Sequence, residues 1–187
     1  MQQYAETHHA LPPAYTTDAD GKPLHSWRTL ILPFLEEQQL YKSIDLTRPW
    51  DDPVNAKACN TIVDAYRCPS VDCPENHTTY LAVLTPSSCF RPTKPRSLSE
   101  ITDGAPETLM VIEVDSEHAV PWMSPVDADE KVVMGIGPES KLAHVGGVQA
   151  AFVDGSVRFL DADMSAAERR ALISIAGNDK AASEGAD

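Results

Sequence analysis

An Asp-Gly pair between two strand-like runs constrains the fold of this chain more than any other feature. The runs 149–153 (QAAFV) and 156–160 (SVRFL) are rich in apolar and β-branched residues, and Asp154 and Gly155 separate them. This pair suits a two-residue type I′ turn, because both central positions of that turn need positive φ. The sequence therefore predicts an antiparallel β-hairpin with a two-residue turn.

The chain opens with a helix-compatible run, residues 2–9, that has no N-cap signal and that ends before the diproline Pro12-Pro13. An uncapped start of this kind resembles the tail of a longer helix whose beginning was removed. We expect residues 2–9 to be helical and to pack one face on the sheet.

Further signals predict short helices in the first third of the chain. Ser26 can cap a helix that runs through Ile31. Pro33 then predicts a kink or a fresh helix that continues through Ile44, because proline lacks an N–H and clashes with the preceding turn. The pair Asp52-Pro53 is a further start signal, for a short helix.

The later part of the chain has the character of strands and loops. Residues 78–84 and 108–114 are short, apolar and β-branched, as strands are. Residues 89–95 and 119–130 contain several prolines and predict long surface loops. Residues 165–168 form a capping box that begins a short amphipathic helix. Early helices followed by antiparallel strands predict an α+β fold.

Length and charge limit the function of the chain. Its 187 residues fit one domain, 1–187, with a core that needs neither metal nor disulfide to form. Lysine and arginine total 15 against 28 acidic residues, giving a formal charge of -13, so no basic patch is available for nucleic acid. No stretch approaches the roughly 20 apolar residues of a membrane span.

Three residues near the hairpin could suggest a hydrolase: His144, Asp154 and Ser156. The sequence has no G-x-S-x-G elbow, and Ser156 would lie beside a hairpin turn rather than on a strained strand-to-helix bend. We therefore assign no catalytic residue and predict that the chain is not an enzyme. His144 is expected to bond to backbone or to a carboxylate, and so to hold the start of the hairpin in place.

The cysteines do not have the spacing of a zinc site. Cys59, Cys68, Cys73 and Cys89 are separated by eight, four and fifteen residues, which does not match paired C-x-x-C zinc knuckles. No metal or other cofactor is therefore expected. In an exported protein such cysteines favour disulfides, whereas in a cytosolic protein they favour free thiols.

An acidic loop and the tryptophans offer two more candidate binding features. Asp127, Asp129 and Glu130 could hold calcium, but no EF-hand pattern is present and acidic loops are usually solvated. The loops of Trp50 and Trp122 could line a ligand groove, although tryptophans in a domain of this size are more often anchors of core and loops.

The whole chain resembles a bacterial pilin-like family. His144, nine intervening residues and then Asp154-Gly155 have the spacing of the prepilin-type processing-associated H-X(9)-DG domain, domain of unknown function 1559, which here covers the hairpin region 142–160. Further segments resemble that family in the same order: Leu11-Pro12-Pro13-Ala14, Ser26-Trp27-Arg28, Leu32-Pro33-Phe34-Leu35-Glu36, Leu40-Tyr41, Pro49-Trp50-Asp51, Tyr66-Arg67-Cys68-Pro69-Ser70, Tyr80-Leu81-Ala82-Val83, Ile101-Thr102-Asp103-Gly104 and Pro121-Trp122.

The resemblance implies an exported, non-catalytic structural subunit of a pilus-like or type II secretion pseudopilin-like assembly. Its partners would be other pilin-like subunits or the secretion machinery, and an N-terminal transmembrane helix, absent from this sequence, would anchor the full-length protein at the membrane. The chain departs from the family at Val145, where proline is common, and in its extra cysteines Cys59, Cys73 and Cys89. Export to an oxidising compartment implies at least one disulfide among the four cysteines.

A second function remains open. The chain could be an exported solute- or carbohydrate-binding module that uses the Trp50 and Trp122 loops. A ligand bound in those loops would favour the binding module, whereas an apolar helix encoded upstream would favour the structural subunit.

Overall fold

The structure, a computed structural model, describes residues 1–177. Its strands are β1 (Tyr15–Thr17), β2 (Pro23–Ser26), β3 (His77–Thr78), β4 (Tyr80–Ala82), β5 (Leu109–Glu113), β6 (Val120–Pro121), β7 (Gly147–Phe152) and β8 (Val157–Asp161). Its α-helices are α1 (Gln2–His8), α2 (Trp27–Ile31), α3 (Gln38–Lys42), α4 (Ala56–Cys59), α5 (Glu130–Gly135) and α6 (Ala166–Ile173). Single-turn 3-10 helices, η1 to η6, are Leu32–Phe34, Pro53–Asn55, Asp64–Tyr66, Leu98–Glu100, Ala105–Glu107 and Ser116–His118.

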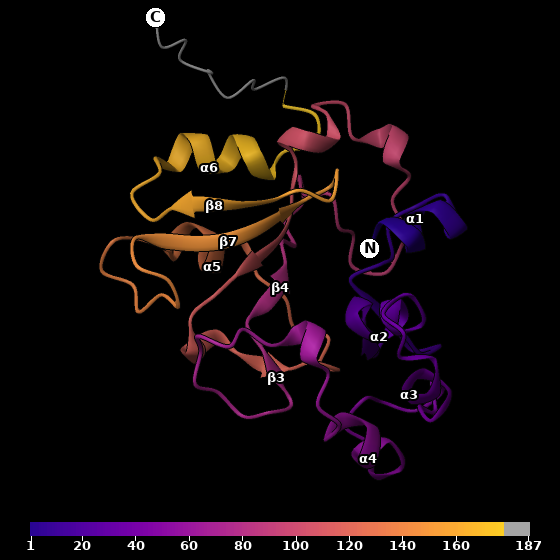
Figure 1. The fold of residues 1–187 in the computed structure, drawn as a ribbon. Coiled ribbons are helices and arrows are strands. Elements are labelled where there is room, and N and C mark those ends of the chain that lie inside the picture. Colours follow the sequence, from indigo (N-terminus) through magenta and orange to yellow (C-terminus); the bar gives the residue numbers. More distant parts are fainter. Residues whose placement is uncertain (178–187) are drawn as a thin grey trace, which may run out of the picture.

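A four-stranded sheet in the order β4-β5-β7-β8 forms the centre of the molecule, and the pairs β1-β2 and β3-β6 form two small sheets. All pairings between these strands are antiparallel. In Figure 1, α6 runs alongside β8, while α1 to α4 gather on another side of the molecule. The arrangement confirms the α+β class. No helix within residues 1–177 combines the length and the hydropathy needed to cross a membrane.

The central sheet buries a hydrophobic cluster on each face. On one face, Phe152 of β7 belongs to a cluster with Leu172 of α6 and Val133 of α5. On the other face, Val111 of β5 packs against a cluster that contains Trp27 of α2. The sheet is therefore covered on both sides, and the N-terminal helices provide the second cover.

The β-hairpin is present, but its turn differs from the prediction. Ala151 pairs with Val157 across β7 and β8. The Phe152 N–H then donates to the Ser156 carbonyl oxygen at 2.9 Å. These pairs leave a loop of three residues, 153–155, instead of two.

The predicted type I′ turn is wrong because Asp154 does not adopt positive φ. Gly155, with φ of 88°, is the residue of this loop in the left-handed region. The Asp154 carboxylate accepts hydrogen bonds from the Ser156 N–H at 2.9 Å and from its hydroxyl at 2.7 Å. A three-residue loop that ends in a left-handed glycine corresponds to a type I turn with a G1 bulge.

Replacing this glycine (Gly155→Val) should lower the free energy of unfolding by about 1–2 kcal/mol, the cost of left-handed backbone for a residue with a Cβ. The added Cβ would also lie 3.1 Å from Gln2 Nε2, which disturbs α1. The matched control is Gly137→Val, because Gly137 has φ outside the left-handed region and a Cβ there would meet no atom within 4 Å. Urea titration measures both variants, and equal stability of the two would contradict this role of Gly155.

The N-terminal segment is helical, as predicted, but it meets the sheet at the hairpin loop. The Gln2 side-chain amide donates to the Val153 carbonyl oxygen at 2.6 Å, and Ala5 is buried. His9, in the left-handed region with φ of 56°, ends the helix. Met1, which precedes α1, lines a cavity with Trp27 of α2 and Val111 of the central sheet.

The helix after Pro33 is broken. The Ser26 hydroxyl accepts from the Arg28 N–H at 3.2 Å, which caps α2 as predicted. Pro33 then lies in η1, and Glu36 adopts positive φ of 63°. A left-handed residue cannot continue a right-handed helix, so the predicted helix through Ile44 is reduced to η1 and the separate α3.

Other local signals have mixed outcomes. Asp52 caps η2, which leads into α4, and Ser165 and Glu168 form the predicted capping box of α6. The predicted strand 78–84 is divided into β3 and β4, because β3 pairs with β6 whereas β4 joins the central sheet. The predicted strand 108–114 corresponds to β5.

Candidate functional site

Three separate segments bring a thiol, a carboxylate and an imidazole together on one face of the central sheet. Cys68 follows η3, Glu113 is the last residue of β5, and His144 precedes β7. We call Cys68, Glu113 and His144 the Cys68 cluster. Strand register fixes Glu113, because it pairs with Tyr80 of the neighbouring strand. His144 is fixed by a backbone bridge to Gly147 at the start of β7.

Within the Cys68 cluster, the polar atoms converge on one nitrogen. His144 Nε2 lies 3.2 Å from Glu113 Oε2 and 3.9 Å from Cys68 Sγ. The side chain of His144 is 31% exposed and that of Glu113 is 1% exposed, while Cys68 is buried. The cluster is thus a mostly enclosed site that solvent reaches through His144. The carboxylate partner expected for His144 is Glu113.

Glu113 is a buried acid with an incomplete set of partners. Its Oε2 accepts a hydrogen bond from the Gln149 N–H at 3.3 Å. Its Oε1 is buried and has no hydrogen-bond partner among the described residues. A buried carboxylate is costly unless a cation or several donors compensate its charge. A positively charged group beside the Glu113 carboxylate would therefore be stabilised.

Burial raises the pKa of the Cys68 thiol above its ordinary value, and its hydrogen bond with Glu113 raises that pKa further. Burial also raises the pKa of the Tyr80 hydroxyl, and the neighbouring Cys68 and Glu113 add to that increase. Both groups are therefore protonated at neutral pH. A protonated thiol is a poor nucleophile.

The cluster does not have the arrangement of a Cys-His-carboxylate triad. In such a triad the base contacts the nucleophile through one ring nitrogen and the orienting acid through the other. Here Cys68 and Glu113 both face Nε2 of His144. The hydrolase interpretation also fails on position, because Asp154 and Ser156 bond to each other at the opposite end of β7 from His144.

The predicted disulfide is absent: Cys59, Cys68, Cys73 and Cys89, which all lie in the described part of the chain, are free thiols. Each of the two buried thiols has another partner. Cys68 faces His144, and Cys89 donates to the Leu109 carbonyl oxygen at 3.6 Å. Burial raises the pKa of Cys89 to about 12. Cys68 and Cys89 therefore lie in different surroundings and do not pair with each other.

The acidic loop is not a solvated calcium loop. The side chain of Asp127 is fully buried and pairs with Arg28 at 2.8 Å. Asp129 accepts from the Val132 N–H and caps α5, and Glu130 pairs with Arg170 on α6. Each acid therefore has its own structural partner, and the three do not converge.

The tryptophan loops do not form the expected ligand groove. Trp122 is 1% exposed, and its indole N–H donates to the Thr61 carbonyl oxygen at 3.0 Å. Trp50 is half-buried and packs against the same hydrophobic cluster as Trp27. Trp50 and Trp122 thus act as anchors of core and loops.

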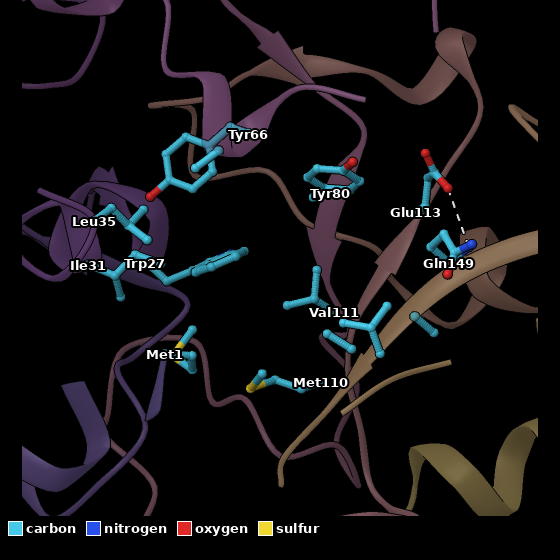
Figure 2. Close-up of a pocket in the computed structure, with 14 residues that line it drawn as sticks. Met1, Trp27, Ile31, Leu35, Tyr66, Tyr80, Met110, Val111, Glu113 and Gln149 are labelled. Carbon is cyan, nitrogen blue, oxygen red and sulfur yellow. Dashed lines mark hydrogen bonds between the residues drawn. The ribbon is translucent and has the colours of Figure 1, made fainter. Parts of the chain in front are cut away.

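An apolar cavity of about 280 Å³ lies between α2 and the central sheet. Figure 2 shows Trp27, Ile31 and Leu35 on one side of it, with Glu113 and Gln149 on the opposite side. The cavity therefore adjoins the Cys68 cluster through Glu113. An apolar lining of this kind suits hydrocarbon groups better than hydroxyl-rich sugars.

Sequence reasoning missed the Cys68 cluster, although two of its members lay in motifs that resemble the family. The cysteine spacing suggested no metal site, and no local pattern connects Cys68 with His144, 76 residues away. The one local signal was Glu113, an acid at the end of an otherwise apolar strand. A charge in such a position indicates a partner on the same sheet face.

Comparison with known proteins supports the family resemblance over part of the chain. A family model described as "Protein of unknown function (DUF1559)" matches residues 1–87. The matched segment includes Ser26-Trp27-Arg28 and Tyr66-Arg67-Cys68-Pro69-Ser70, and it stops before His144. No curated protein and no solved structure matches the chain. Residues 1–87 are therefore similar to this family, whose function is unknown.

Proposed function

We propose that this chain is the exported, non-catalytic head of a pilus-like or pseudopilin-like structural subunit. The observation that carries the proposal is the docking of α1 on the hairpin loop through Gln2, together with the burial of Ala5 in the hydrophobic cluster that contains Val153. In a pilin-like subunit, an N-terminal helix joins the head to the assembly and to the membrane. The contacts of α1 with the hairpin loop would connect such a helix to the central sheet.

Two further observations support the proposal. The match of residues 1–87 to the DUF1559 family is compatible with a surface or pilus-like protein. The formal charge of -13 disfavours direct association of heads, because like-charged molecules repel one another. Assembly would then depend on the N-terminal helices, and the heads would surround that helical spine.

The absence of turnover is part of the proposal. The thiol of Cys68 is the candidate nucleophile of the cluster, and its pKa is raised. Both Cys68 Sγ and Glu113 Oε2 lie next to the same nitrogen of His144, Nε2. That arrangement favours a structural role over acyl transfer, which needs an activated thiolate.

A binding module remains the second candidate, and the apolar cavity is the observation that favours it. Its volume of about 280 Å³ is near the lower limit for small-molecule sites. The lining by Trp27, Ile31 and Met110 favours an apolar solute over a saccharide. The Trp50 and Trp122 loops, which were the expected ligand surfaces, do not support a sugar site.

Light scattering on the purified 187-residue chain tests the assembly proposal. We expect a monomer of 20.4 kDa at low salt, where the repulsion between the negatively charged heads is least screened. A salt-independent oligomer of the isolated head would contradict assembly through the N-terminal helix. Tight binding of an apolar solute by this monomer would favour the binding module instead.

A further inference from the structure

The donor atoms of the Cys68 cluster have the spacing of metal ligands. Cys68 Sγ, Glu113 carboxylate oxygen and His144 Nε2 all lie within 4.8 Å of one another. Tetrahedral Zn²⁺ with bonds of about 2.0–2.3 Å separates its ligand atoms by roughly 3.3–3.7 Å. The observed separations of 3.2 Å and 3.9 Å lie on either side of that range. Small side-chain shifts would therefore bring all three atoms to one ion.

The chemistry of the three donors also favours a transition-metal ion of intermediate softness. Thiolate, imidazole and carboxylate together suit Zn²⁺, whereas Ca²⁺ and Mg²⁺ prefer sites built of oxygen atoms alone. Cys68 and Glu113 both approach the same nitrogen of His144, so the three donor atoms converge on one point.

Glu113 provides independent support for a cation. Its side chain is 1% exposed, and Oε1 has no hydrogen-bond partner among the described residues. The Gln149 N–H bonds to Oε2 and holds the carboxylate in place, as an outer-shell donor does at a metal site. A divalent ion would neutralise the buried charge that the neighbouring residues leave incompletely compensated. The part-exposed His144 offers the ion a path from solvent.

We propose that Cys68 Sγ, a carboxylate oxygen of Glu113 and His144 Nε2 bind a divalent transition ion with the preferences of Zn²⁺. The three protein ligands leave a fourth coordination position for water. The ion ties together the loop after η3, the end of β5 and the start of the β7–β8 hairpin. This role is separate from assembly, and it can be measured on the isolated head.

Calorimetric titration of the reduced, chelator-treated chain with ZnCl₂ tests the site, and CoCl₂ serves as a spectroscopic probe of the thiolate. We expect one equivalent of Zn²⁺ to bind and the thermal midpoint to rise. Co²⁺ should give a thiolate-to-metal charge-transfer band. Each of Cys68→Ser, Glu113→Gln and His144→Gln should weaken binding by more than about 100-fold, since even outer-shell changes cost about 10- to 100-fold.

Matched controls separate this site from adventitious binding. Cys73→Ser removes a half-buried thiol outside the cluster, and His118→Gln removes an exposed histidine that bonds to Asp115. Both controls should bind Zn²⁺ as the parent chain does. His144 is part-exposed, so His144→Gln keeps the test valid even if Glu113→Gln does not fold. No Zn²⁺ binding by the parent chain, or equal binding by parent and Cys68→Ser, would overturn the proposal.

Discussion

Arg28→Met should lower the free energy of unfolding by about 3–5 kcal/mol, the usual cost of removing one partner from a buried ion pair. The side chains of Arg28 and Asp127 are both fully buried, and 2.8 Å separates Nη1 from Oδ1. The substitution leaves the Asp127 charge buried without its cation. It also removes the guanidinium donors from four backbone carbonyl oxygens, those of Tyr80, Trp122, Ser124 and Val126.

The pair of the exposed Arg48 and the half-buried Asp52 provides the matched control. Arg48 is 61% exposed, so Arg48→Met should change stability by less than about 1 kcal/mol. The double variant Arg28→Met/Asp127→Asn should lose less free energy of unfolding than the two single variants lose in total, because it leaves neither charge buried without its partner. Urea titration at neutral pH measures all of these proteins. A loss below about 1 kcal/mol for Arg28→Met would show that the pair does not organise the core.

Gly147→Ala should lower the free energy of unfolding by about 3 kcal/mol, the upper end of the usual cost of overpacking. A Cβ at Gly147 would overlap the Leu160 carbonyl oxygen and lie 2.7 and 2.8 Å from two ring carbons of Phe159. The carbonyl is backbone of β8, so relief requires the two strands to separate at the end of the hairpin next to His144. The Cys68 cluster would move with them.

Gly137→Ala is the control for Gly147→Ala, because a Cβ at Gly137 meets no atom within 4 Å. Its stability should match that of the parent chain within about 0.5 kcal/mol, as is usual for surface substitutions. Thermal and urea unfolding measure the difference between the two variants. Equal stability of the two would mean that the close approach of β7 and β8 at Gly147 is not required.

The sequence predicted those features of the fold that depend on neighbouring residues. The Ser26 cap and the Ser165 capping box were correct, since each depends on hydrogen bonds within a few residues. The hairpin was also correct, but its turn was not. Asp154-Gly155 suits both two- and three-residue loops. In the structure the Val153 and Asp154 N–H groups of the loop donate to the Thr108 and Ala105 carbonyl oxygens, which are distant contacts that the local sequence does not show.

Long-range contacts could not be predicted in this way. Arg28 and Asp127 are 99 residues apart, so the interpretation of Asp127 as a solvated acid was wrong. The Cys68 cluster likewise depends on sheet register, which places Glu113 beside Tyr80 and brings the start of β7 within reach. Spacing along the chain contains no such information. The predicted disulfide failed for the same reason, since free Cys68 and Cys89 are positioned by tertiary packing.

Crosslinking in cells of the native host tests the assembly proposal most directly, with the full-length protein taken as the head together with the N-terminal membrane helix that the proposal includes. The proposal predicts a ladder of homo- or hetero-oligomers in the membrane or fibre fraction. The same cells producing the 187-residue chain without further N-terminal sequence should give no ladder, because the heads repel one another. A full-length protein that remains a dispersed monomer in cells, while the isolated head binds a defined solute tightly, would contradict assembly as the function of this chain.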